Sequence, residues 1–157
     1  MAFNDLIESL GEELGIDLHA DFHGLCQMMI NEKLKVQLEA DTTGEFLLIV
    51  SMICDLPPGK FRENILKDAL KANYKIQENY GILSYIGPEN SLALFNHIPM
   101  HGLTGKELYE HLSIFVQRAL GWQKAIDEGF SSPPDSNEVP KADSVTKNSL
   151  FGFQDKT

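Results

Sequence analysis

The sequence predicts an α+β domain in which three helices pack against a five-stranded antiparallel sheet, in the order α-β-β-β-α-β-β-α. A nearly unbroken apolar run from Phe46 to Ile53 is bounded by Gly44 and by the pair Pro57-Pro58, as expected for a buried strand. Directly after it, apolar residues recur at helical spacing from Phe61 to Tyr74, with charged residues between them. Because tight turns separate the remaining strands, we expect neighbouring strands to pair antiparallel.

The elements before this central strand are a helix and a hairpin. Apolar residues recur every three or four positions from Phe3 to Leu14, and Gly15 should end this helix. We expect Phe22 to Ile30 to form the first strand, with a hairpin turn at Asn31-Glu32-Lys33. Apolar and polar residues then alternate from Val36 to Ala40, which is the pattern of a half-buried strand.

Two strands and a long helix follow the second helix. The strands are expected at Tyr80 to Ile86 and Ser91 to Ile98, joined by a turn at Gly87-Pro88-Glu89-Asn90. A capping box at Thr104 and Glu107 opens the last helix, which should run to Glu128. The three helices should cover one face of the sheet. Both faces of the last strand carry apolar residues, so a partner or a second copy is expected to cover the other face.

The composition changes after the last helix. We therefore expect one folded domain over residues 1–129, followed by a flexible polar tail over residues 130–157 that begins with a Ser- and Pro-rich stretch. Leu150, Phe151 and Phe153 form the one apolar cluster of this tail. Two interpretations stay open: a loose tail with scattered aromatic residues, or a short docking motif for this protein or a partner.

The charge and cysteine content exclude several classes of protein. The chain has 157 residues with 13 Lys and Arg against 23 Asp and Glu, a formal net charge of −10. Nucleic-acid binding needs clustered basic residues and is not expected. Cys26 and Cys54 lack the spacing of a metal site and should be free thiols. Neither a signal peptide nor a membrane-spanning run is apparent, so the protein is expected in the cytoplasm.

No pattern in the sequence predicts an enzyme, and no cofactor or metal is expected. His97 and His101 are four residues apart, but Pro99 between them excludes presentation on one helical turn. A second group of possible metal ligands occurs near the N-terminus, and a metal-dependent hydrolase built on it remains an alternative. This group contains Asp17, His19, Asp21 and His23.

One motif carries a resemblance to a known family. Leu56-Pro57 precedes a helix that contains Ile65-Leu66-x-x-Ala69-Leu70-x-Ala72-Asn73, and a long helix closes a small, acidic α+β domain. In these features the chain resembles the class I chaperones of bacterial type III secretion, the Tir-chaperone family, from Met1 to about Gly129. The tail beyond Gly129 is longer than that of many members.

The resemblance implies a cytoplasmic bacterial homodimer that binds the N-terminal region of one or more secreted effectors in extended form, keeping it soluble and competent for secretion. It further implies contact with the ATPase of the secretion apparatus. An effector-binding patch is expected at Phe3, Ile7, Leu10, Leu25, Val36 and Leu38. A dimer interface is expected at Phe61, Ile65, Leu66, Leu70, Tyr74, Ile82 and Ile86. The alternative is a small-molecule-binding or regulatory α+β domain.

Overall fold

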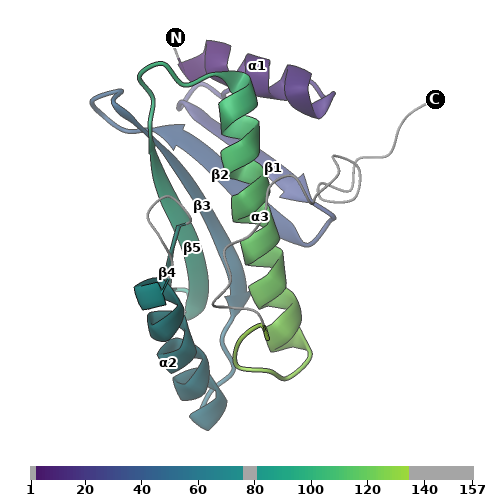
Figure 1. Cartoon of the computed structure of the whole chain (residues 1–157), viewed down its shortest axis with the longest axis vertical. Helices are drawn as coiled ribbons and strands as arrows, with labels where there is room; N and C mark the ends of the chain where they lie inside the picture. Colours follow the sequence, from purple (N-terminus) through teal and green to yellow (C-terminus); the bar gives the residue numbers. More distant parts are fainter. Residues whose placement is uncertain (1–2, 76–80, 135–157) are drawn as a thin grey trace, which may run out of the picture.

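The computed structural model describes residues 3–75 and 81–134 and confirms the predicted order of elements (Figure 1). Three helices and five strands are present in these residues: α1 (Phe3–Leu14), β1 (Leu25–Ile30), β2 (Leu34–Ala40), β3 (Phe46–Asp55), α2 (Lys60–Lys75), β4 (Ile82–Ile86), β5 (Ser91–Pro99) and α3 (Gly105–Asp127). The expected tail from residue 135 onward lies outside the described residues.

The sheet is antiparallel throughout, with the strand order β1-β2-β3-β5-β4. The longest strands, β3 and β5, pair from Phe46 opposite Pro99 to Asp55 opposite Ser91. The register shifts once, between Met52 and Cys54. This arrangement makes the apolar run of β3 the centre of the sheet and leaves β1 and β4 as the two edges.

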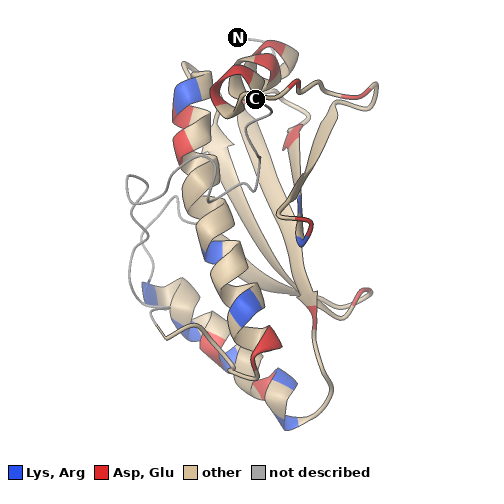
Figure 2. Ribbon diagram, turned by 90° about the vertical axis from the view of Figure 1, so that its right-hand side faces the viewer, with Lys and Arg blue, Asp and Glu red and all other residues tan. Residues whose placement is uncertain are grey.

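The helices lie on one side of the sheet (Figures 1 and 2). Along β3 the burial alternates, since Leu47, Ile49 and Ile53 are buried while Phe46 and Met52 are exposed. The long helix α3 buries Trp122 and Phe115, the two largest fully buried side chains. The core therefore fills the space between this helix layer and one face of the sheet.

Helices α1 and α3 approach each other closely where α3 begins. The predicted capping box is present, because the Glu107 amide donates to Thr104 Oγ1 over 3.1 Å and the Thr104 amide donates to Glu107 Oε2 over 3.4 Å. The next residue, Gly105, packs on α1: a Cβ placed there would lie 2.8 Å from the carbonyl carbon of Ser9. Only glycine fits this contact without displacing α1.

Two polar side chains of α3 bind backbone groups of the sheet side. Gln123 donates from Nε2 to the carbonyls of Lys33 and Ile53, over 2.9 Å and 2.8 Å. Buried Arg118 donates from Nη1 to the Gly81 carbonyl over 2.6 Å, and desolvation lowers its pKa to about 10. These bonds fix the C-terminal half of α3: Gln123 binds it to the β1–β2 hairpin and to β3, and Arg118 binds it to the residue before β4.

The first strand starts later than expected. Residues 22–24 form a turn, because the Asp21 carboxylate accepts hydrogen bonds from the amides of His23 and Leu25. Phe22 is consequently 91% exposed and does not belong to the strand. The strand expected from Tyr80 is observed from Ile82 onward, and Tyr80 lies outside the described residues.

Candidate protein-binding surfaces

The side of the sheet opposite the helices carries large apolar residues that no described element covers. Phe46 and Met52 of β3 are 40% and 46% exposed, and Leu48 and Val50 between them are half-buried. Phe95 of β5 lies opposite Val50 and shares its face. We call this surface the open sheet face and define it by these five residues together with Ile82 of β4 and Met29 of β1, both exposed.

Polar and apolar residues are separated across the open sheet face. One row of directly paired residues runs Ile82, Phe95, Val50, Gln37 and Gln27 from β4 to β1. Its first three residues are apolar, and its last two join their side-chain amides over 3.0 Å. The apolar part therefore lies over β4, β5 and β3, and the outward residues of β2 form a polar strip beside it.

The two edges of the sheet differ in what they offer to another chain. At β4, Asn73 of α2 occupies the edge: its Nδ2 donates to the Leu83 carbonyl over 2.8 Å, and its Oδ1 accepts from the Leu83 amide over 2.9 Å. This side chain mimics the backbone of a neighbouring strand. It satisfies both outward groups of Leu83, so β4 is protected at this point.

The edge of β1 is open along most of its length. At its start, the Leu25 amide donates to the Asp21 carboxylate and the Leu25 carbonyl accepts from the Asp21 amide. The backbone groups of Leu25 thus point away from β2. In an antiparallel ladder every second residue shares this direction, so those of Gln27 and Met29 point outward as well. Among the described residues, none forms a hydrogen bond to these four outward groups.

The residues expected in the effector-binding patch are mostly in the core of the single chain. Ile7, Leu10, Val36 and Leu38 are fully buried between α1, α3 and the sheet. In the single chain these four side chains contribute to the core. Phe3 and Leu25 are half-buried, and they are the accessible members of the set. The apolar stripe of α1 is used for packing within the chain.

The residues expected at the dimer interface divide between core and surface. Ile65 is fully buried, and Phe61, Leu66 and Ile86 are half-buried. Leu70 and Tyr74 are 70% and 90% exposed and lie one helical turn apart on α2. We call these two residues and exposed Ile82 of the adjacent β4, which also belongs to the open sheet face, the α2–β4 cluster.

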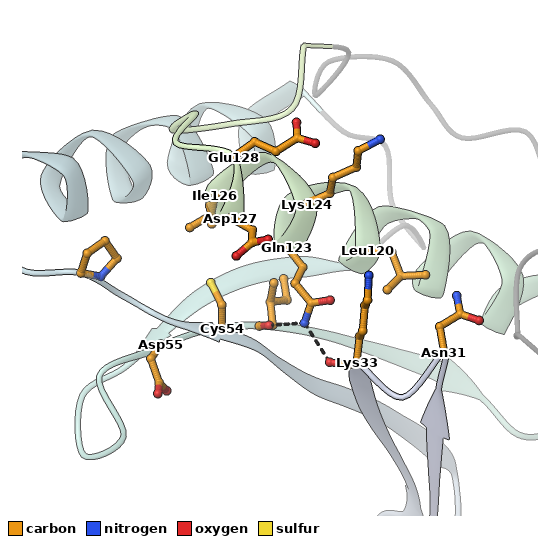
Figure 3. Close-up of a pocket in the computed structure, with 12 residues that line it drawn as sticks. Asn31, Lys33, Cys54, Asp55, Leu120, Gln123, Lys124, Ile126, Asp127 and Glu128 are labelled. Atoms are coloured by element: carbon orange, nitrogen blue, oxygen red, sulfur yellow. Dashed lines mark hydrogen bonds between the residues drawn. The ribbon is translucent and has the colours of Figure 1, made fainter.

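A groove of about 1120 Å³ lies beside the C-terminal half of α3 (Figure 3). Its apolar walls include Ile53, Pro57, Leu120 and Ile126. Cys54 lines it as a half-buried free thiol. Burial, followed by the charges of Asp55 and Asp127, raises the pKa of this thiol to about 11. The thiol is therefore protonated near neutral pH and is not activated as a nucleophile.

The polar cluster near the N-terminus forms only part of the expected metal-ligand group. His19 Nε2 lies 2.8 Å from Asp17 Oδ1, and its Nδ1 lies 3.6 Å from Glu8 Oε1, both at the exposed surface. Asp21 instead holds the turn before β1. Within residues 3–75 and 81–134, no three His, Cys, Asp or Glu side chains group closely enough to hold a metal ion. No helix in those residues is long and apolar enough to cross a membrane.

The described residues thus form an α+β domain whose prominent surface features are uncovered apolar side chains and one open strand edge. A model of the Tir chaperone protein (CesT) family matches residues 5–123, and the chain belongs to this family. The predicted family and fold class are thereby confirmed. Comparison with curated protein sequences found no match.

Three solved complexes contain chains with a similar fold. The HopA1–SchA chaperone–effector complex contains a chain 20% identical to this one, with a TM-score of 0.64, covering 78% of this chain and 94% of that chain. The Yersinia pestis type III secretion chaperone SycH, solved with a fragment of YscM2, is 17% identical with a TM-score of 0.59, and the match covers 76% of this chain and 98% of that chain. The ExoT–SpcS complex from Pseudomonas aeruginosa contains a chain that is 17% identical with a TM-score of 0.59, and the match covers 75% of this chain and 94% of that chain.

The sequence predicted a sheet face that the helices leave uncovered, but of the residues that define the open sheet face only Ile82 was among the predicted site residues. A signal for it exists, because the run from Phe46 to Ile53 is apolar at both alternating positions. A strand with one solvated face would carry polar residues at every second position. The run was interpreted as a buried strand, and within the described residues the structure buries one of its faces and leaves Phe46 and Met52 of the other exposed.

Proposed function

We propose that this protein is a type III secretion chaperone that binds an extended N-terminal segment of secreted effector proteins and acts without catalysis. Membership of the chaperone family supports the proposal. Of the structural relatives, HopA1–SchA is described as a chaperone–effector complex and SycH as a type III secretion chaperone. The observation that carries it is the contrast between the two sheet edges, one occupied by Asn73 and one open at Gln27 and Met29.

An effector segment would bind by β-augmentation at β1. The outward amides and carbonyls of Gln27 and Met29 offer up to four backbone hydrogen bonds to an added strand. Alternate side chains of that strand would then lie beside Leu25 and Met29 on the open sheet face, and the segment could continue across the apolar part of that face. An unfolded segment rich in apolar residues is otherwise prone to aggregate, which gives binding alone a function.

The edge can be tested by proline substitution at Met29. The Met29 amide points away from β2, so Met29→Pro removes an edge donor without removing a ladder bond. Met29→Gln keeps the amide and serves as the matched control. We expect a tagged pull-down from the source cells to retain a secreted protein protected from proteolysis only over an N-terminal segment. M29Q should retain it and M29P should lose it.

One outcome would contradict this function, and another would contradict only the proposed binding edge. Recovery of the chain alone, or with a folded enzyme complex, would favour the small-molecule-binding or regulatory alternative. Equal retention by M29P and M29Q would contradict binding at β1 while leaving the chaperone function in place.

The α2–β4 cluster is proposed as the homodimer interface. Leu70 and Tyr74 expose apolar and aromatic surface of the kind enriched in obligate interfaces. A charge buried there without a partner should dissociate the dimer. We expect sedimentation equilibrium at micromolar concentration to give a dimer for the natural chain and for Phe22→Asp, and a monomer for Leu70→Asp. Residence in the bacterial cytoplasm and contact with the secretion ATPase belong to the same proposal and rest on family membership.

A further inference from the structure

The groove beside α3 is large enough to hold several side chains of a chain segment. Pockets for drug-sized molecules hold roughly 300–1,000 Å³, and this groove holds about 1120 Å³. Its walls come from the β1–β2 hairpin at Lys33, the end of β3 and the last turns of α3 (Figure 3). Of its apolar wall residues, Leu120 and Pro57 are half-buried and present surface to an occupant, whereas Ile53 and Ile126 belong to the core.

The charges of the groove select a weakly basic occupant. Asp55, Asp127 and Glu128 line it together with Lys33 and Lys124, which gives a local net charge of −1 from three acids and two bases. Figure 3 shows that Asp127 points toward Cys54 at the floor, while Lys124 extends away from it. Such pairs at a solvated rim contribute orientation more than affinity.

The chain itself contains a segment of this chemistry. Leu150, Phe151 and Phe153 form the apolar cluster of residues 135–157, and Lys147, Asp155 and Lys156 beside them give a local net charge of +1. In an extended backbone Phe151 and Phe153 lie on the same side, and Gly152 between them carries no side chain. The segment would therefore present a narrow aromatic ridge suited to a groove.

The tether to this segment starts a few residues after the groove wall. Helix α3 ends at Asp127 in the groove wall, the Phe130 amide donates to the Ala125 carbonyl, and Pro134 is the last described residue. Fifteen residues, 135–149, connect Pro134 to Leu150. A flexible chain of that length has an r.m.s. span of roughly 20–24 Å, shorter than the ~35 Å length of α3. A tether matched to its span gives an effective concentration in the millimolar range.

We propose that Leu150–Phe153 binds in the groove beside α3 of the same molecule, with Phe151 and Phe153 directed toward Leu120 and Pro57. The tail is then an internal ligand that shields this apolar surface. This inference does not depend on the proposed chaperone function.

Site-specific cross-linking in the full chain tests the occupant directly. A benzophenone amino acid replaces Phe153, the protein is irradiated, and adducts are mapped by mass spectrometry. We expect adducts on the groove walls, within 120–128 or 53–57. A mixture of ¹⁵N-labelled and unlabelled copies distinguishes cross-links within one molecule from those between molecules. Adducts between copies, adducts on another surface, or no adduct would each overturn the proposal.

Thiol labelling gives an independent readout. Cys54 lines the groove, whereas Cys26 is buried and serves as the internal reference. The double variant Phe151→Ser, Phe153→Ser should raise the rate of Cys54 labelling by iodoacetamide severalfold. The control Val139→Ser, Val145→Ser removes apolar residues elsewhere in the tail and should leave the rate unchanged. Equal rates in the two variants, with Cys26 labelling constant, would overturn the proposal.

Discussion

Replacing Asn73 by alanine tests whether one side chain protects the edge of β4. Asn73 is half-buried on α2 and forms two hydrogen bonds to the backbone of Leu83, at 2.8 Å and 2.9 Å. Both are part-buried. The substitution removes the donor and the acceptor together and leaves the amide and the carbonyl of Leu83 without this partner.

The expected loss of stability follows from these two bonds. Each is worth about 1 kcal/mol net, and a part-buried group left without a partner adds to the cost, so the bonds contribute ~2–3 kcal/mol. Alanine is a better helix former than asparagine by up to ~0.7 kcal/mol, which offsets part of this loss. We therefore expect N73A to lower the free energy of unfolding by about 1.5–2.5 kcal/mol.

Urea denaturation followed by far-UV circular dichroism measures this loss. The control is Lys71→Ala, an exposed position on the same helix, where the change should be within ~0.5 kcal/mol. The midpoint should fall in N73A while the slope with urea stays constant. If N73A and K71A unfold at the same midpoint, the two bonds to Leu83 contribute no stability and Asn73 does not protect the edge.

Two further substitutions test the packing of α1 and a turn of the sheet. Gly105→Ala would bring a Cβ against Ser9 and should lower the free energy of unfolding by ~1–3 kcal/mol through overpacking. The control Gly121→Ala on the same helix meets open space and should stabilise the protein by up to ~1 kcal/mol. Equal urea midpoints for the two variants would contradict the close contact. Burial alone would raise the pKa of Asp41, but hydrogen bonds from Thr43 and from three backbone amides together lower it. The contribution of Asp41 to stability is therefore present above its unfolded pKa and lost as the pH falls. Asp41→Asn should flatten the decrease of Tm below about pH 4. Parallel profiles of Tm against pH for the natural chain and the variant would refute this.

Local signals in the sequence were sufficient for most of the fold. The capping box at Thr104 fixes the start of α3, because both hydrogen bonds depend on residues only three positions apart. The helical spacing of apolar residues fixes α1, and Gly15 follows it with a positive φ of 75°. The start of β1 was missed because the Asp21 carboxylate competes for the amides that a longer strand would use.

The binding surfaces were harder to predict for a physical reason. Periodicity shows that the stripe containing Ile7 and Leu10 is apolar, but it does not show whether the chain itself or a partner covers that stripe. Here α3 and the sheet cover it, and the residues are fully buried. For Leu70 and Tyr74 the same kind of pattern ends at the surface instead. That distinction depends on contacts between segments far apart in the sequence.

The exposed apolar surface and the acidic composition are linked. A sheet with Phe46 and Met52 uncovered, and with an open edge at β1, is prone to associate with any exposed strand. A net charge of −10 opposes association between copies without occupying the apolar side chains. Asn73 occupies the β4 edge at Leu83, so in the proposed binding mode an added strand pairs with β1. The net charge, the occupied edge and the open edge together allow an apolar sheet to bind a specific segment without nonspecific aggregation.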